Sequence, residues 1–583
     1  MRIAGLLGWA CALLAIAAAP RLIAAPARAT LHVGMWTLWH DKEVHLTTGG
    51  KASLCVGGNG ACRPIARPLV VRVDGADRIK LANADRTEVM GSLRLSGTIT
   101  LSAHGETKTL PYPVTITASS GSLRIAVTLP VERYVEQVVA SESGPADTME
   151  SLKALSIVVR SYALHESHGH AEYDVCDSTH CQLLHWNEAL PRRAVAHRAT
   201  LETAGETLWF HGRRALAYFN KDCGGHSAAM NEVWPKAAAI PYLSARVDRW
   251  CTGTGQQWAT ELTRDEVAAA LAKKGLSSPG WQRLTVERRA ESGRVVTVRL
   301  DGTTVAAEDF RIAVGETLGW NKIPSTWFEV SQNGDRLHVH GRGWGHGVGL
   351  CQRGAAVMGD KGRNAAEILA QYFPGAQAAD ESTGKPWIAR AGEGFLLETL
   401  EGDDRRFLND VARARAEASH RSGLNASAPI TVRAFASISA FRDETLAPGW
   451  VAAFAEGDWI ATQPLSTLAA RNLLASTLRH EFLHALVEQQ TGPAAPLWLR
   501  EGLVELWSAS DQGAAIRQRR AAFSFDTVEA SLRHSDTEAQ SEAAHREAAI
   551  YAAKLVDRFG RDQVLQWLRS GVPTEVLVGI AHR

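Results

Sequence analysis

The stretch "YVEQVVASESGPADTMESLKALSIVVRSYA", from Tyr134 to Ala163, decides the fold of the region around it. Its second part, beginning at Asp147, carries apolar residues at helical spacing and predicts a helix. Asp147, with Glu150 three residues later, predicts a capping box at the start of that helix. Glu142 follows an apolar segment and precedes Gly144-Pro145, so we expect it at the end of an element.

Two interpretations of Glu142 follow from this position. A carboxylate held beside apolar residues has a raised pKa, which suits a general acid. The alternative is a solvated surface glutamate, since Glu and Asp side chains are mostly exposed. Glu150 is explained by its place in the predicted cap.

Strand and helix patterns extend from this stretch in both directions. Alternating segments from Thr30 to about Thr117 predict strands, as do "TVERRAESGRVVTVRL" and "RLHVHG" further on, and "AAEILAQYFPGA" predicts a helix. Residues 378–394 are polar and rich in turn formers, which predicts a linker. Beyond the linker the patterns are mostly helical, with one strand predicted at "PITVRAF".

Length and charge limit the class of protein. A chain of 583 residues is too long for one hydrophobic core, so we expect two or more domains. Its 63 basic residues nearly cancel its 62 acidic ones. This balance removes the electrostatic argument for a nucleic-acid partner or an anionic membrane surface.

The N-terminus has the pattern of a secretory signal. Arg2 precedes an apolar run, and Ala27-Arg28-Ala29 fits the small-x-small cleavage rule, which predicts removal of residues 1–29. The alternative is a retained membrane anchor, but Pro20 and Arg21 interrupt the apolar run. We therefore expect export to the periplasm or cell envelope, with no stable membrane span after cleavage.

Seven of the eight cysteines lie beyond the predicted signal. In an oxidising compartment Cys55/Cys62 and Cys223/Cys251 can form disulfides, and an odd count leaves at least one thiol. A short span between residues 165 and 185 also concentrates possible zinc ligands: His165, His168, His170, Cys176, His180, Cys181 and His185. Two alternatives stay open there, a closed tetrahedral zinc site or a Cys176–Cys181 disulfide.

Two glycine-containing segments are difficult to explain by packing. Gly224-Gly225 follow Cys223, and "GRGWGHGVGLCQRGA" has glycine at every second position from 341 to 349. Glycine permits positive φ and close approach of another group to the backbone. Trp344 and His346 lie between these glycines and suit the face of a neutral sugar, so we expect these two side chains, with Gly224 and Gly225, to bind substrate.

The succession "YVEQVVASES", "ESLKALSIVVRSYA", "YDVCDSTHCQ", "DCGGHS…EVW", "PYL" and "GRGWGHGVGLCQRGA" resembles the SpoIID/LytB family over residues 30–377. Some members of this sporulation stage II protein D-like family are lytic transglycosylases of peptidoglycan, and others enhance a cell-wall amidase. The resemblance implies peptidoglycan glycan strands as the partner, with a cell-wall amidase as a further one. It places the catalytic glutamate on Glu142 and the metal or structural cluster on His170, Cys176, His180 and Cys181.

The chain departs from that family at two motifs. Glu142-Ser143-Gly144-Pro145 replaces the usual Glu-Met-Pro, and Lys153-Ala154-Leu155 replaces Lys-Ala-Gln. A single carboxylate still suffices for a lytic transglycosylase, because the C6 hydroxyl of the substrate replaces water as the nucleophile. A hydrolytic glycosidase normally needs two.

A second candidate site lies in "LRHEFLHALVEQQ", within a helical run predicted from about Ser466 to Gln490. His480 and His484 share one helix face and can bind one zinc ion, with Glu481 as general base. "PLWLREGLVELW" supplies Glu501 as third ligand, with Glu505 as its rival. The pattern resembles the gluzincin metallopeptidases over residues 395–583; the alternative is a chance pair of histidines.

These observations predict an α+β protein of two domains. A strand-rich SpoIID-like domain at residues 30–377 precedes a mainly helical zincin-like domain at residues 395–583, with zinc expected in the second domain and, as an alternative, also at the Cys/His cluster. We expect an exported enzyme that binds and cleaves glycan and carries a zinc peptidase domain. The alternative is a non-catalytic activator of an amidase, with an inactive peptidase-like domain.

Overall fold

The computed structural model describes residues 30–56, 62–82, 87–165, 169–186, 189–253, 255–276, 280–400, 405–509, 513–534 and 537–581. The predicted signal at residues 1–29 lies outside this part of the chain. Within it, no helix combines the length and apolar character needed to cross a membrane.

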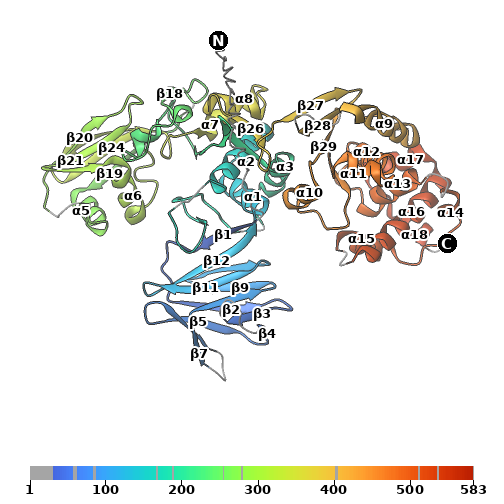
Figure 1. Ribbon diagram of the computed structural model, residues 1–583, viewed down its shortest axis with the longest axis horizontal. Coiled ribbons are helices and arrows are strands. Elements are labelled where there is room, and N and C mark those ends of the chain that lie inside the picture. The colour runs from blue at the N-terminus through green and yellow to red at the C-terminus, as the bar shows by residue number, and fades with distance from the viewer. Residues whose placement is uncertain are drawn as a thin grey trace, which may run out of the picture.

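Two sheets dominate the N-terminal region, drawn in blue at the bottom of Figure 1, and their strands are antiparallel except for the parallel pair β1 and β13. One has seven strands in the order β13-β1-β12-β11-β8-β3-β4, and the other has six in the order β10-β9-β2-β5-β6-β7. The strands are β1 (Thr30–Met35), β2 (Glu43–Thr48), β3 (Ser53–Val56), β4 (Cys62–Pro64), β5 (Leu69–Asp74), β6 (Arg78–Ala82), β7 (Thr87–Met90), β8 (Ser92–Ser96), β9 (Ile99–Ala103), β10 (Glu106–Leu110), β11 (Val114–Ser119), β12 (Ser122–Pro130) and β13 (Val175–Cys176).

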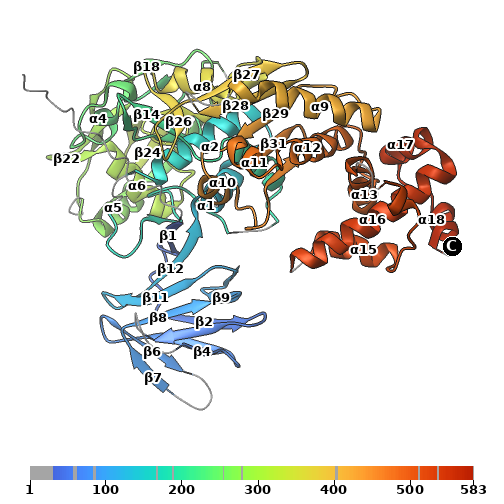
Figure 2. The ribbon, with the colours of Figure 1, turned by 45° about the vertical axis from the view of Figure 1, so that its right-hand side comes forward.

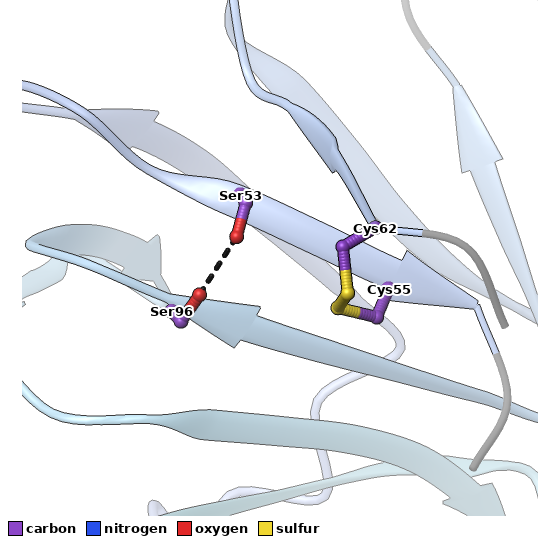
Figure 3. Close-up of a disulfide and its surroundings, with 4 residues drawn as sticks. All are labelled: Ser53, Cys55, Cys62 and Ser96. Carbon is purple, nitrogen blue, oxygen red and sulfur yellow. Dashed lines mark hydrogen bonds between the residues drawn. A yellow bond between two sulfur atoms is a disulfide. The ribbon is translucent and has the colours of Figure 1, made fainter. Parts of the chain in front are cut away.

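Alternating apolar residues produce these strands, as the sequence predicts. In β12, every second residue from Leu123 to Leu129 is buried, because side chains alternate between the faces of a strand. The expected Cys55–Cys62 disulfide joins β3 to β4, and beside it the hydroxyls of Ser53 and Ser96 are 2.8 Å apart (Figure 3). The disulfide and this hydrogen bond both tie β3 to its neighbours in the sheet.

Helices α1 (Val131–Glu142), α2 (Met149–Ala163) and α3 (Arg193–Glu202) pack together at the centre of the molecule. The predicted cap of α2 is wrong by one residue. Thr148 is the N-cap and accepts the N–H of Ser151, whose hydroxyl accepts the N–H of Thr148. Asp147 instead accepts the N–H of Gly144, while Glu150 accepts the N–H of Ala365.

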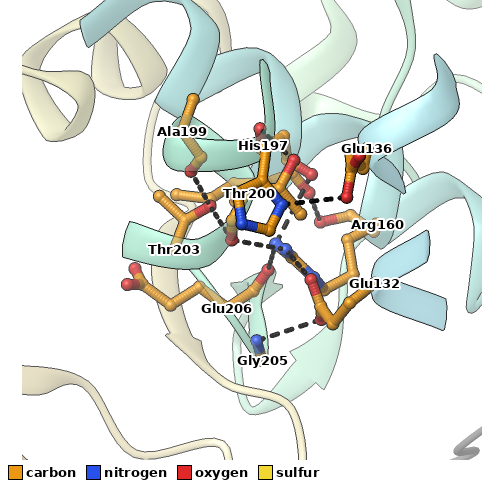
Figure 4. Close-up of polar contacts among 12 residues, drawn as sticks. Glu132, Glu136, Arg160, His197, Ala199, Thr200, Thr203, Gly205 and Glu206 are labelled. Carbon is orange, nitrogen blue, oxygen red and sulfur yellow. Dashed lines mark hydrogen bonds and ion pairs between the residues drawn. The ribbon is translucent and has the colours of Figure 1, made fainter. Parts of the chain in front are cut away.

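A buried ion pair holds these helices together (Figure 4). The Arg160 guanidinium on α2 donates from Nε to Glu132 Oε1 at 2.8 Å and from Nη2 to Oε2 at 2.5 Å. It also donates to the carbonyls of Glu206 and Thr200, while the N–H of Gly205 donates to Glu132. Because a buried charge is costly unless it is paired and hydrogen-bonded, this arrangement fixes how α1 and α2 cross.

A second lobe, green in Figure 1, has its own apolar core and two three-stranded sheets. Its elements are β19 (Gln257–Thr263), α5 (Arg264–Lys273), β20 (Leu284–Arg289), β21 (Val295–Leu300), β22 (Thr303–Ala306), α6 (Ala307–Leu318), β23 (Phe328–Asn333) and β24 (Arg336–Arg342).

Short strands and three helices connect this lobe to the centre. They are β14 (Glu206–Phe210), β15 (Arg213–Arg214), β16 (Phe219–Asn220), β17 (His226–Ser227), α4 (Met230–Val233), β18 (Arg246–Val247), β25 (Leu350–Cys351), α7 (Gln352–Asp360), α8 (Ala365–Tyr372) and β26 (Gln377–Asp380). The pairing of β16 with β25 is parallel and brings the two glycine-containing segments side by side.

The C-terminal region is mainly helical, as expected, but it holds more strands than predicted. A sheet in the order β27-β28-β29-β31-β30 includes "PITVRAF" as β29. The strands are β27 (Trp387–Gly392), β28 (Phe395–Leu400), β29 (Ile430–Ala434), β30 (Ala453–Glu456) and β31 (Trp459–Thr462). A short buried run such as "FLLETL" cannot be told from helix by periodicity alone, so the sequence did not predict this strand.

Helices cover this sheet and continue beyond it, as Figure 2 shows in orange and red. They are α9 (Leu408–Ser422), α10 (Ile438–Thr445), α11 (Leu465–Ala470), α12 (Leu474–Glu488), α13 (Leu497–Ser508), α14 (Gly513–Arg517), α15 (Phe525–Arg533), α16 (Glu538–Phe559), α17 (Arg561–Ser570) and α18 (Thr574–Ala581). The helical run predicted from Ser466 to Gln490 is interrupted between α11 and α12, at Asn472, which has a φ of 56°. The α+β class is confirmed.

The segment predicted as a linker, residues 378–394, carries paired strands. Its first residues belong to β26, which pairs with β14, and β27 pairs with β28 of the C-terminal sheet. A small apolar cluster also joins α3 to the C-terminal sheet, through Leu201, Ala204, Phe435, Phe441, Trp459 and Ala461. The two sides of the segment are therefore in direct contact.

Candidate functional site

A cavity of about 580 Å³ opens where the N-terminal sheets, the central helices and the second lobe meet. Glu142, at the last position of α1, lies in its wall. The rest of the lining combines aromatic rings with a few polar groups, which is typical of a ligand site. The aromatic members are Trp36, Trp39, Tyr162, Tyr218, Phe219, Trp320 and Trp344.

Three carboxylates line the cavity, and only one is without a hydrogen bond in the described part of the chain. Glu106 accepts from Trp36 Nε1 at 2.9 Å, and Asp177 accepts the N–H of Trp36 at 2.7 Å. The Glu142 carboxylate has no such partner among the described residues. Burial raises the pKa of Glu142 to about 7. The positive charge of Lys221 opposes this rise, and the negative charge of Asp147 adds to it. Glu142 therefore combines access to the cavity with a pKa suited to proton transfer near neutrality.

The glycine-containing segments form one wall of the cavity. Trp344 lies in the lining, and its backbone pairs with that of Asp222 through hydrogen bonds of 2.7 and 3.0 Å. His346 lies between the rings of Tyr218 and Trp234, and its Nδ1 accepts the N–H of Val348. Burial lowers the pKa of His346 to about 4, so the ring is neutral at pH 7.

Gly224 and Gly225 are placed differently from the expectation. Neither lies in the cavity lining; both have positive φ and lie behind the wall. A Cβ on Gly343 would approach the carbonyl of Asp222 to 2.8 Å and the nitrogen of Gly224 to 3.0 Å. The glycines therefore let the two segments cross closely.

Sequence patterns missed several lining residues. Trp36 and Trp39 come from the end of β1, Lys221 follows β16, and Lys108 comes from β10. Trp36 has a φ of 55°, a left-handed conformation that is rare for a bulky side chain, and Asp177 holds it there. The two tryptophans in "GMWTLWHD" were the available signal.

The Cys/His cluster borders the same cavity through Cys181. One ligand atom from each of His170, Cys176, His180 and Cys181 lies within 4.8 Å of the others, and both cysteines are thiols. His170 Nε2 is 3.2 Å from Cys181 Sγ, and His180 Nδ1 is 3.6 Å from the same sulfur. Two soft sulfurs and two imidazoles fit the donor requirements of zinc. Of the other predicted histidines, His168 lies outside the described residues, while His165 and His185 are not in the cluster.

Hydrogen bonds, first from Cys181 and then from His180 and Ser178, lower the pKa of the Cys176 thiol to about 3. The cluster is therefore predisposed to hold a thiolate, the form that binds metal.

Comparison with known families identifies the family of the region that contains Glu142 and this cluster. Residues 119–210 match the family model SpoIID, described as stage II sporulation protein. They form a SpoIID-family domain. Residues 251–349, which include the second lobe, match a domain of unknown function, DUF8618. Neither match extends beyond residue 349.

Full-length proteins show the same relationship. The chain is 27% identical over 284 residues to stage II sporulation protein D of Bacillus subtilis, which covers 46% of this chain and 80% of that protein. It is 28% identical over 255 residues to an uncharacterized protein of Brachyspira hyodysenteriae, covering 43% and 67%. It is 23% identical over 293 residues to the amidase enhancer of Bacillus subtilis, covering 41% of this chain and 39% of that protein. The match thus spans less than half of the amidase enhancer.

Outside the SpoIID domain, α12 and α13 bring the second candidate site together. His480 Nε2 and His484 Nε2 are 3.0 Å apart, and Glu501 Oε2 is 3.7 Å from His484 Nε2. Burial lowers the pKa of both histidines to about 3, so they are neutral. Burial, and then the charge of Glu501, raises the pKa of Glu481 to about 8.

This C-terminal arrangement is looser than the Cys/His cluster beside the SpoIID cavity. Among the described residues it is not one of the groups in which three or more ligand atoms all lie within 4.8 Å. Glu505 faces His545 of α16, with 3.7 Å between Oε1 and Nδ1, and His545 Nδ1 is 4.0 Å from Glu501 Oε2. No sequence motif pointed to His545, because α16 lies far along the chain.

Proposed function

We propose that the N-terminal region cleaves peptidoglycan glycan strands as a lytic transglycosylase that uses Glu142 alone. The observation that carries this proposal is the Glu142 carboxyl, with a pKa of about 7 and no hydrogen bond to a described residue, in an aromatic-lined cavity of about 580 Å³. Similarity to stage II sporulation protein D and to an amidase enhancer supports a cell-wall substrate. The predicted signal supports action outside the cytoplasm, in the periplasm or cell envelope.

In this reaction the protonated Glu142 gives its proton to the glycosidic oxygen as the bond to the muramoyl C1 breaks. The resulting carboxylate then takes the proton of the C6 hydroxyl, whose oxygen bonds to C1 and leaves a 1,6-anhydromuramoyl end. The carboxyl is restored, and no water is consumed. Trp344 and the tryptophans at the end of β1 provide flat apolar surfaces for sugar rings, and Gly224 and Gly225 support the wall from behind.

The test is mass spectrometry of the products from peptidoglycan with and without stem peptides. We expect Glu142→Gln to remove the anhydromuramoyl product and to retain glycan binding, because the amide keeps the shape but has no proton to give. Glu150→Gln, at the start of α2 and outside the cavity lining, is the matched control and keeps activity. Undiminished product in Glu142→Gln would contradict the assignment.

The alternative of an amidase activator makes a different prediction. Wild-type protein would then release no anhydromuramoyl product, yet would stimulate a cell-wall amidase, and Glu142→Gln would stimulate it equally. The partner would in that case be the amidase in addition to the glycan strand.

We further propose a zinc peptidase function for the C-terminal region. The specific observation in its favour is the approach of His480 Nε2, His484 Nε2 and Glu501 Oε2 at distances of 3.0 and 3.7 Å. Two imidazoles and a carboxylate, with a fourth position left for water, are the donor set of a catalytic zinc site. The proposal gives Glu481 the role of general base, and a zinc ion held by His480, His484 and Glu501 would supply the lowered pKa of a bound water.

Metal analysis of variants of the full chain tests this function. We expect His484→Ala and Glu501→Ala to lose about one zinc ion per chain relative to wild type, because three protein ligands are needed at such a site. Glu481→Gln should keep that zinc and lose peptidase activity. Glu505→Gln decides between the rival third ligands: loss of zinc in this variant but not in Glu501→Ala would assign the role to Glu505.

A further inference from the structure

A second buried group of possible metal ligands lies behind the cavity wall. Cys223 follows β16, Asp248 and Cys251 follow β18, and Cys351 ends β25. All four are buried, with the three cysteines fully inaccessible and Asp248 1% exposed. One ligand atom from each lies within 4.8 Å of the other three. The expected Cys223–Cys251 disulfide is absent, and the three cysteines are thiols.

The number of sulfur atoms argues against a disulfide here. A bond between any two of the three cysteines leaves the third thiol buried beside it, and no fourth cysteine among the described residues belongs to this group. A metal ion uses all three sulfurs and the carboxylate at once, and thiolates are preferred ligands of zinc.

Backbone donors already point at one of the sulfurs. Cys351 Sγ accepts the N–H of Cys223 at 3.3 Å and that of Gly354 at 3.4 Å, and Cys351 is the N-cap of α7. Burial raises the pKa of the Cys351 thiol, and these two N–H groups with the positive end of a helix offset part of the cost of a negative charge on its sulfur.

The carboxylate is oriented as a ligand usually is. Asp248 Oδ1 accepts the N–H groups of Trp250 at 3.0 Å and Cys251 at 3.3 Å, and Oδ2 accepts the hydroxyl of Tyr372 at 3.0 Å. Oδ2 is also 3.3 Å from Cys223 Sγ. Hydrogen bonds of this kind around a metal ligand fix its direction.

A fully buried guanidinium lies next to this group and is stabilised by negative charge, of which buried Glu308 is one source. Arg294 donates to the carbonyl of Cys223 at 2.9 Å and to that of Gly345 at 3.3 Å, and its Nε has no hydrogen bond in the described structure. Three thiolates and a carboxylate around a divalent cation leave a net negative charge, which would offset the charge of Arg294.

We propose that Cys223, Asp248, Cys251 and Cys351 bind a structural zinc ion. The ion ties together three segments, of which two continue directly into the cavity wall: Phe219–Lys221 before Cys223, and Trp344–His346 before Cys351. With four protein ligands the site is closed, so it holds the wall and takes no part in bond cleavage. The proposal is independent of the glycan reaction and of the zinc peptidase.

The experiment measures zinc in a full-length background that lacks the other two candidate sites, through Cys176→Ser, Cys181→Ser, His480→Ala and His484→Ala. We expect this background to retain about one zinc ion per chain and to lose it on Cys251→Ser or Cys351→Ser, because each removes one of four ligands. Cys55→Ser with Cys62→Ser, which removes a disulfide elsewhere, is the control and keeps the zinc.

A second measurement does not depend on whether the variants fold. Wild-type chain is denatured with a chelator and without a reductant, alkylated, and digested for mass spectrometry. We expect the alkyl label on all three of Cys223, Cys251 and Cys351. A disulfide between any two of them, or a folded background protein without zinc, would overturn the proposal.

Discussion

Glu142 shows how one residue acquires a chemical property from its surroundings. It ends α1 in the wall of the aromatic-lined cavity, where burial raises its pKa and the nearby Lys221 lowers it. The resulting value of about 7 means that the acid and base forms are both accessible near neutrality. A residue that first gives and then takes a proton needs this balance.

The first prediction concerns the pH profile. Proton donation needs the protonated carboxyl, so kcat/KM for anhydromuramoyl release should fall as the pH rises through about 7. Lys221→Met removes the charge that lowers the pKa of Glu142, and should move this alkaline limb upward by a few tenths to about one pH unit. Lys236→Met, which is exposed and outside the cavity lining, should leave the limb in place. If the alkaline limb of Lys221→Met lies at the same pH as that of the wild type, the ionisation that sets this limb is not that of Glu142.

At the scale of elements, glycine determines how closely strands and loops approach. Gly349 precedes β25 with a φ of 74°, and the N–H of Leu350 donates to the carbonyl of Tyr218 at 2.9 Å. A Cβ on Gly349 would lie 2.1 Å from that same carbonyl oxygen. The parallel pairing of β16 with β25 therefore depends on the absence of a side chain at this position.

The second prediction follows from this contact. Gly349→Ala should lower the free energy of unfolding by about 3 kcal/mol or more, from the left-handed φ and the backbone clash together. Gly212→Ala is the matched control, since Gly212 has the same φ of 74° and no neighbour within 4 Å of the added Cβ. It should cost about 1 kcal/mol. Equal losses in urea unfolding would show that backbone conformation alone decides the effect.

Periodicity and motifs predicted the elements that local sequence controls. The strands up to β11, the helix α2 and the position of Glu142 at an element end follow from spacing and from Gly144-Pro145. The N-cap of α2 did not follow from the sequence, because Asp and Thr are both good N-caps. One local and one distant partner decided it, since the N–H of Gly144 donates to Asp147 and that of Ala365 donates to Glu150.

The sequence alone could not predict which distant segments come together in the fold. Lys221 and Trp36 reach the cavity from elements far from Glu142 along the chain, and neither carries a motif. The grouping of Asp248 with three cysteines likewise depends on which loops meet behind the wall. Residue types suggested ligands, but only the fold says which ones share a site.

At the scale of the whole molecule, one arginine joins the central region to the C-terminal sheet. Arg433 on β29 is 4% exposed; its Nη1 is 2.8 Å from Glu206 on β14, and its Nε is 2.8 Å from Glu398 on β28. The guanidinium also lies 4.7 Å from the ring of Trp387. Among the described residues, Arg433 is the cation that forms ion pairs with both carboxylates.

The third prediction tests this junction. Arg433→Met should lower the free energy of unfolding by roughly 3–5 kcal/mol, because it leaves the buried Glu206 and the half-buried Glu398 without their paired cation. Adding Glu206→Gln should recover part of the loss, since one uncompensated charge is then removed. Arg413→Met, whose contact with Asp410 is exposed at 3.8 Å, should change stability by less than about 1 kcal/mol. Equal effects at the two arginines, measured by calorimetry, would contradict the role of the junction.

The parallel pairing of β16 with β25 also has a consequence for timing. Asn220 donates to the carbonyl of Leu350, 130 residues further along the chain. A chain that emerges from its N-terminus can complete the sheets built from β1 to β12 early, but contacts between distant segments form late. We therefore expect the cavity to stay incomplete until Cys351 has emerged. Under the function proposed above, the site that cleaves glycan would then be assembled only at a late stage of synthesis.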